Sequence, residues 1–288
     1  MSGIAPQTAT GFRLGVLGAG RLGEAIARTW LVRTGQAPLV WSRSGSHSGV
    51  DSRAADATWV GDWTRLLEAR SIVIAVPGKA LLQLVEGNEV GSPAAGEAVS
   101  AGVSEAAGQF TGNVFCAAAS LSQTSLQRAF PRATVFCVSP FLIDGVNSIP
   151  MLVLRPPECP AEKWIEAKAE LEMFGEVDVV NGEDNFAQLA LLGASWPSVV
   201  IAGVQAAAAA GLQNIADENS SRVGHRIFFR AMRSLLATRA GTTEQQTTNG
   251  IAAPGGITER GLQSLGDVKS LFESVFKQMQ ARAAELRA

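Results

Sequence analysis

The first 180 residues alternate between short apolar runs and stretches whose apolar residues recur at helical spacing. Apolar runs without polar alternation are typical of strands that are buried on both faces of a sheet. These runs predict strands at residues 13–17, 38–42, 71–76, 113–118, 134–138, 151–154 and 176–180. Helical spacing predicts helices at residues 22–32, 62–70 (capped by Asp62) and 160–174. Strands separated by helices indicate an α/β fold with a doubly wound parallel sheet.

The strand pattern ends near Asn181, and the rest of the chain predicts helices at residues 183–192, 197–216, 217–238 and 258–286. We therefore expect an α/β domain at residues 1–181 and an all-helical domain at residues 182–288. Residues 91–109 are rich in alanine, glycine and serine, and their pattern leaves open whether they form a weak helix or a surface excursion.

Residues 185–216 contain no charged side chain and resemble a membrane span in that respect. They consist largely of Ala, Gly, Ser and Gln, with Pro197 among them, and such a composition inserts poorly into lipid. We expect no membrane span here, but a helix buried in a core or in a subunit interface. An uncharged helix in an all-helical domain favours a homodimer.

The composition removes several kinds of active site. The chain has no tyrosine, two histidines and three cysteines, so a Tyr-x-x-x-Lys dehydrogenase site is excluded and a zinc site is not expected. The net charge is −2 and basic residues are dispersed, so we expect no nucleic-acid partner. Cys116 and Cys137 lie in apolar runs, which favours reduced thiols and a cytoplasmic protein; the polar N-terminus does not have the pattern of a signal peptide.

A Gly-x-Gly-x-x-Gly motif directly follows the first predicted strand and opens the first predicted helix, in the sequence Gly18-Ala19-Gly20-Arg21-Leu22-Gly23. This context indicates a dinucleotide-binding turn. Gly18 allows the tight turn, Gly20 allows the backbone to approach the pyrophosphate, and Gly23 allows close packing of helix and strand. Arg21 and Leu22 lie at the helix start, where free N–H groups favour phosphate.

The end of the second predicted strand indicates which dinucleotide is bound. A site for NAD carries Asp or Glu there, which binds the ribose 2′-hydroxyl. This chain instead has Ser42, Arg43 and Ser44, and the first carboxylate comes only at Asp51. Hydroxyls and a guanidinium suit a 2′-phosphate, so NADP(H) is the predicted cofactor. The ends of later strands are predicted to line its nicotinamide side, at Ala75, Val76, Pro77, Ala117 and Ala118.

A second glycine motif, Pro254-Gly255-Gly256-Ile257-Thr258, precedes the last predicted helix. Taken alone, it predicts a helix cap at Thr258. Such a turn also presents backbone N–H groups to a carboxylate.

Together, these features resemble the pyrroline-5-carboxylate reductase family. Residues 14–27 are similar to its opening strand and helix, residues 72–77 to its Val-Ile-Leu-Ala-Val-Lys-Pro strand without the lysine, and residues 253–258 to its signature. The resemblance implies NADPH-dependent reduction of a cyclic imine, pyrroline-5-carboxylate, to proline at the interface of a homodimer. It assigns the hydrogen bond to the imine nitrogen to Thr258, and the substrate carboxylate to Gly255 and Gly256.

Two departures from the family pattern imply a reshaped substrate pocket. Phe141 stands where the family has asparagine in Met-Pro-Asn-Thr-Pro, and Ala253 replaces a serine. Phe141 is therefore a predicted substrate contact, and a larger or less polar imine is an alternative substrate. Two other functions stay open, an NADP-dependent reductase of hydroxy or keto acids and a non-catalytic NADP-binding regulatory protein. The scarcity of acid–base side chains in this chain favours an imine substrate over a carbonyl substrate. A cyclic imine is basic enough to be protonated near neutral pH, so its reduction needs little general acid from the protein.

Overall fold

The structure is a computed structural model that describes residues 14–43, 56–85, 105–118, 121–141, 148–213, 217–239 and 266–286. The chain forms two compact units, Met1–Ala194 with Ala283–Ala288 and Ser195–Arg282. The last strand ends at Val180, close to the predicted end of the strand pattern at Asn181. The next helix, α6 (Glu183–Ala190), still belongs to the first unit, because its Phe186 packs against the core of the sheet.

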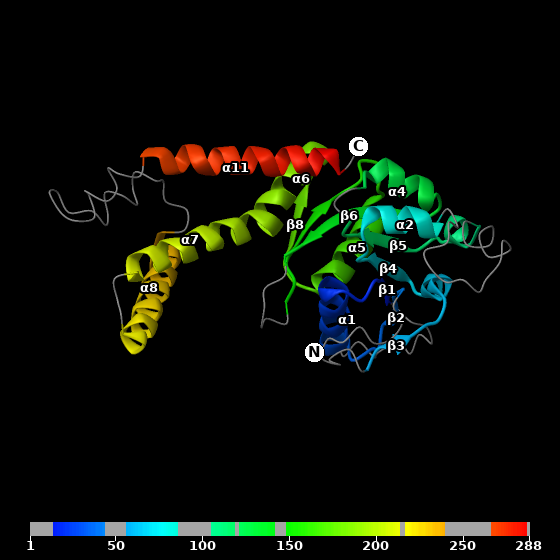
Figure 1. The fold of residues 1–288 in the computed structure, drawn as a ribbon. Helices are drawn as coiled ribbons and strands as arrows, with labels where there is room; N and C mark the ends of the chain where they lie inside the picture. Colours follow the sequence, from blue (N-terminus) through cyan, green and yellow to red (C-terminus); the bar gives the residue numbers. More distant parts are fainter. Residues whose placement is uncertain are drawn as a thin grey trace, which may run out of the picture. The chain divides into compact units, whose positions relative to one another are not determined.

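One sheet forms the centre of the first unit, with strand order β3-β2-β1-β4-β5-β6-β7-β8 (Figure 1). The strands are β1 (Leu14–Leu17), β2 (Leu39–Trp41), β3 (Thr58–Trp59), β4 (Ser71–Ile74), β5 (Asn113–Cys116), β6 (Thr134–Pro140), β7 (Met151–Leu154) and β8 (Val177–Val180). All seven predicted strands are present, and only the two-residue β3 was not predicted. The α/β fold with a Rossmann-type sheet is thus confirmed.

One strand departs from the predicted parallel sheet, because β7 runs antiparallel to β6. The connection explains this direction. Ten residues separate Pro140 from Met151, whereas a parallel crossover needs a dozen or more, usually with a helix. Strand β8 is again parallel to β7, and the helix α5 (Ala161–Glu172) connects them.

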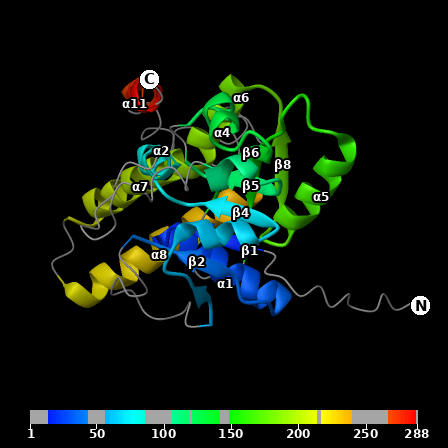
Figure 2. The same cartoon turned by 90° about the vertical axis from the view of Figure 1, so that its right-hand side faces the viewer.

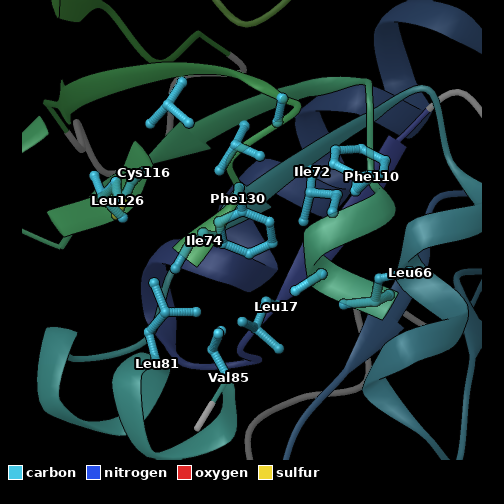
Figure 3. Close-up of a cluster of buried hydrophobic side chains, with 14 of the residues drawn as sticks. Leu17, Leu66, Ile72, Ile74, Leu81, Val85, Phe110, Cys116, Leu126 and Phe130 are labelled. Carbon is cyan, nitrogen blue, oxygen red and sulfur yellow. The ribbon is translucent and has the colours of Figure 1, made fainter. Parts of the chain in front are cut away.

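Helices cover both faces of the sheet (Figures 1 and 2). The helix α1 (Arg21–Thr34) and α5 pack on one face, where Ile26, Trp30 and Leu171 are buried. The other face is covered by η1 (Trp63–Glu68), α2 (Gly78–Val85), α4 (Gln123–Ala129) and α6. Figure 3 shows side chains of the core on this second face. The Asp62 cap is confirmed, since its carboxylate accepts a hydrogen bond from Thr64 N at 2.9 Å, but the segment that follows is a 3₁₀ helix.

The second unit is helical. It contains α7 (Trp196–Leu212), α8 (Glu218–Arg239) and most of α11 (Gly266–Glu285). The Trp196 ring makes edge contacts with Phe272 and Phe276 of α11, with centroids 5.7 and 5.1 Å apart. The predicted helices of the second half are therefore present, as far as the described residues reach. Residues 105–109 of the open segment 91–109 are helical, and the rest of it lies outside the described residues.

The segment without charged side chains is exposed. The helical stretch Glu183–Leu212, with the π-helical segment η2 (Leu191–Ser195) between α6 and α7, is long and apolar enough to cross a membrane by length and composition. It is the one stretch of that kind in the part of the chain that the structure describes. Ala208 alone is buried in α7, and Ile201 is 54% exposed. Of the two expected alternatives, burial of α7 in the core of its own chain is therefore wrong, and burial in a subunit interface stays a prediction.

Candidate functional site: the carboxyl edge of the sheet

The glycine motif forms a tight turn between β1 and α1. Gly18 has a φ of 107°, a conformation that favours glycine, and its N–H donates to Trp41 O at 2.8 Å. A Cβ at Gly18 would lie 2.7 Å from the Val76 side chain. A Cβ at Gly23 would lie only 1.8 Å from Gly18 O. Both positions therefore need glycine for the fold itself.

Gly20 differs from the other two glycines of the motif. It is the N-cap of α1, it has no side-chain cap, and no atom lies within 4 Å of a Cβ built there. Packing within the chain therefore does not require glycine at this position. The turn presents an exposed backbone at the first turn of α1, where Arg21 and the half-buried Leu22 follow. Such a turn suits a phosphate group, because the first N–H groups of a helix have no partner inside it.

The end of β2 lies beside this turn. Leu17 of β1 pairs with Trp41 of β2, so Ser42 and Arg43 follow directly at the carboxyl edge. Arg43 is exposed. Ser44, also predicted to bind the cofactor, lies outside the described residues. Neither described residue that follows β2 is a carboxylate, and this edge offers a hydroxyl and a guanidinium.

The ends of β4 and β5 continue the same edge. Ala75 N donates to Leu17 O at 2.8 Å, and Ala117 N donates to Ile74 O at 2.9 Å. The structure therefore brings Ala75, Val76 and Pro77 next to the glycine turn, with Ala117 and Ala118 one strand further along. These sequence-predicted residues thus share one edge of the sheet with Gly18, Gly20 and Gly23.

A small cavity of about 70 Å³ opens between the ends of β5 and β6, α4 and α6. Its walls include Cys116, Ala118, Cys137, Ser139 and Glu183. The Glu183 carboxylate accepts a hydrogen bond from Gln123 N at 2.9 Å. Burial raises the pKa of the Cys116 thiol to about 12, so it is a neutral thiol at physiological pH. Sequence reasoning did not find this cavity, because long-range packing of α6 on the sheet creates it.

Phe141 follows β6 at the same edge, and its N–H donates to Pro150 O at 2.8 Å. Its ring lies against Gly193 in η2: a Cβ at Gly193 would be 2.5 Å from the Phe141 Cε1 and Cζ atoms. The ring is half-buried. Phe141 thus forms a fixed apolar wall at this edge. The contact between Phe141 and Gly193 was not predicted from the sequence.

The second glycine motif lies outside the described residues, as do Gly255, Gly256, Thr258 and Ala253. His225 is described: it lies on α8, is exposed, and stacks on Phe229 with centroids 6.3 Å apart. No group of three or more His, Cys, Asp or Glu side chains that would hold a metal ion occurs among the described residues.

The arrangement can be compared with proteins of known structure. The sequence matches no protein-family model and no curated protein. By structure, the chain is similar to a pyrroline carboxylate reductase from Plasmodium falciparum that was solved with NADP bound. The TM-score is 0.74 at 14% identity, over 96% of this chain and 98% of the other.

Two bacterial structures agree with the first. The pyrroline-5-carboxylate reductase from Coxiella burnetii gives a TM-score of 0.72 at 17% identity, over 96% of this chain and 99% of the other. The enzyme from Streptococcus pyogenes gives 0.70 at 16% identity, over 94% and 97%. This chain has the pyrroline-5-carboxylate reductase fold. The likeness runs over nearly the whole of each chain and includes the helical part of this one.

Proposed function

We propose that this protein is an NADPH-dependent reductase of a cyclic imine, either pyrroline-5-carboxylate, which would give proline, or a related compound. The glycine turn carries the proposal, since Gly20 leaves its backbone open at the start of α1, beside Ser42 and Arg43. The likeness to a pyrroline carboxylate reductase solved with NADP bound supports it.

The residues at the carboxyl edge fit NADP(H). The open turn at Gly20 would receive the pyrophosphate, and Arg43 would pair with the 2′-phosphate through its guanidinium. The small residues Ala75, Ala117 and Ala118 leave room for a flat ring at the ends of β4 and β5. The bound cofactor would supply the hydride. The chain would position the ring and exclude water from that edge.

Thr258, Gly255 and Gly256 are our proposed substrate residues. The Thr258 hydroxyl would hydrogen-bond the imine nitrogen, and the glycine turn would hold a carboxylate with backbone N–H groups. A protonated imine carries its own positive charge, so the carbon accepts hydride with little help from a protein acid. Phe141 is a further proposed substrate contact, which favours an imine with more apolar surface.

A homodimer would cover the exposed apolar residues of the helical unit. Ile201 on α7, Ile227 and Leu236 on α8, and Leu271 on α11 are 54%, 61%, 67% and 60% exposed. Large exposed apolar side chains in this number are typical of an interaction surface. A second copy of the chain is our proposed partner. No disulfide joins the three cysteines, which supports a reducing, cytoplasmic location.

Two alternatives have weaker support. A reductase of hydroxy or keto acids commonly uses a lysine as proton donor in its helical half, and residues 181–253 contain none. A non-catalytic NADP-binding protein is favoured only by the departures at Phe141 and Ala253. Oxidation of NADPH in the presence of a panel of cyclic imines, followed by absorbance, tests the proposal. Binding of NADPH without oxidation by any imine would support the non-catalytic alternative.

A further inference from the structure

Two cysteines face each other across neighbouring strands. Cys116 of β5 and Cys137 of β6 are direct partners in the parallel pairing of these strands. Both belong to the core on the α2 and α4 side, whereas the residues before them, Phe115 and Phe136, belong to the core on the opposite face. The two thiols therefore extend from the same face of the sheet. Figure 3 shows Cys116 among the side chains of that core.

The distance between the two strands suits a metal ion bridging the two sulfur atoms better than a disulfide bond between them. Neighbouring strands are about 4.8 Å apart. A disulfide needs Cβ atoms roughly 3.5–4.5 Å apart, so this pair would have to draw the strands together. No disulfide joins these residues in the structure. A metal–thiolate bond is about 2.3 Å long, and two such bonds in line span about 4.6 Å.

The cavity described above lies beside the pair, since Cys116 and Cys137 both line it. The number of protein ligands available at this site indicates which metal ion it would bind. A structural zinc site needs four ligands, and the described residues contain no group of three or more His, Cys, Asp or Glu that would hold a metal ion. Two thiolates in line instead match a soft ion with two-coordinate geometry, for which thiolate is the preferred donor.

We propose that Cys116 and Cys137 form a binding site for one soft monovalent cation of the Cu(I) class, which would bridge β5 and β6. On binding, each thiol would release its proton to the buffer and the ion would leave its carrier ligand, so no electrons are transferred.

Ala117 and Ala118 directly follow Cys116 and line the same cavity. Occupancy would therefore also lower turnover by a reductase of the kind proposed above; that consequence rests on the proposed function. Binding itself does not, and it is tested without any substrate. If the protein binds the ion but reduces no imine, the ion site is supported and the proposed function is contradicted.

The test is an anaerobic competition titration of the full chain against a coloured Cu(I) chelator. We expect one Cu(I) per chain to be taken from the chelator. Cys116→Ser and Cys137→Ser should each weaken this binding at least tenfold. Cys159→Ser is the matched control, because Cys159 is a buried cysteine that packs on the opposite face of the sheet; it should leave the binding unchanged.

X-ray absorption of the Cu(I)-loaded wild-type protein tests the same geometry if a serine variant does not fold. Two sulfur neighbours in a linear arrangement are expected. The proposal is overturned if the chelator keeps its copper, if either serine variant binds as tightly as the wild type, or if the absorption spectrum shows nitrogen, oxygen or three-coordinate ligation.

Discussion

The Phe141 ring fills the space that a side chain at Gly193 would need, since a Cβ there would lie 2.5 Å from ring atoms Cε1 and Cζ. Gly193→Ala should therefore force the ring aside and destabilise the protein by about 1–3 kcal/mol in urea unfolding. Gly211→Ala is the control, because no atom lies within 4 Å of a Cβ at that helical position. A double variant, Gly193→Ala with Phe141→Ala, should lose less stability than the two single variants summed. If the stability loss of the double variant equals the sum of the two single losses, the contact between Phe141 and Gly193 is contradicted.

The three glycines of the first motif should respond differently to substitution by alanine. Gly23→Ala places a Cβ 1.8 Å from Gly18 O, and Gly18→Ala strains a residue with a φ of 107°. Both should lower the free energy of unfolding, Gly23→Ala by about 3 kcal/mol or more. Gly20→Ala should leave stability within about 1 kcal/mol but weaken NADPH binding, because its open space would receive the pyrophosphate. Calorimetry of NADPH binding to Gly20→Ala, beside its unfolding curve, checks this; unchanged affinity would remove Gly20 from the site.

Much of this edge could be predicted from local sequence. The order of apolar runs gave the strands, and parallel strands bring their carboxyl ends to one edge, so Gly18, Ala75 and Ala117 came together as expected. The antiparallel β7 follows from a β6 strand that runs on to Pro140, two residues beyond its predicted end, which leaves only ten residues before Met151. The contact of Phe141 with Gly193 joins residues 52 positions apart in the sequence. The cavity beside Cys116 needs three-dimensional packing for the same reason.

Arg43 should decide between the two nicotinamide cofactors. It is exposed at the end of β2, and a guanidinium pairs well with a phosphate dianion. Arg43→Ala should weaken NADPH binding about tenfold or more and leave NADH binding nearly unchanged. Fluorescence titrations with both cofactors measure the ratio. If Arg43→Ala weakens the binding of NADPH and NADH equally, Arg43 does not recognise the 2′-phosphate.

The buried Cys116 thiol should make stability depend on pH in the alkaline range. Its pKa is about 12 in the folded chain, against an ordinary thiol value of 9.0. Between these values the unfolded chain releases a proton that the folded chain retains, so the folded state loses stability as the pH rises from about 9 towards 12. The slope from this group is about 1.4 kcal/mol per pH unit. Urea unfolding of the wild type and of Cys116→Ala at pH 8 and pH 10 measures it. The variant should lose less stability over this range, and equal losses would contradict the raised pKa.

We propose that this chain transfers hydride from NADPH to a cyclic imine with the help of Thr258. The most direct test of this proposal is the rate of NADPH oxidation by the purified full-length protein with pyrroline-5-carboxylate and a panel of bulkier cyclic imines, compared with Thr258→Ala. We predict turnover with at least one imine, a loss of about a hundredfold in Thr258→Ala, and NADPH affinity that stays within about twofold. Tight NADPH binding without oxidation by any imine, or full turnover in Thr258→Ala, would contradict the account.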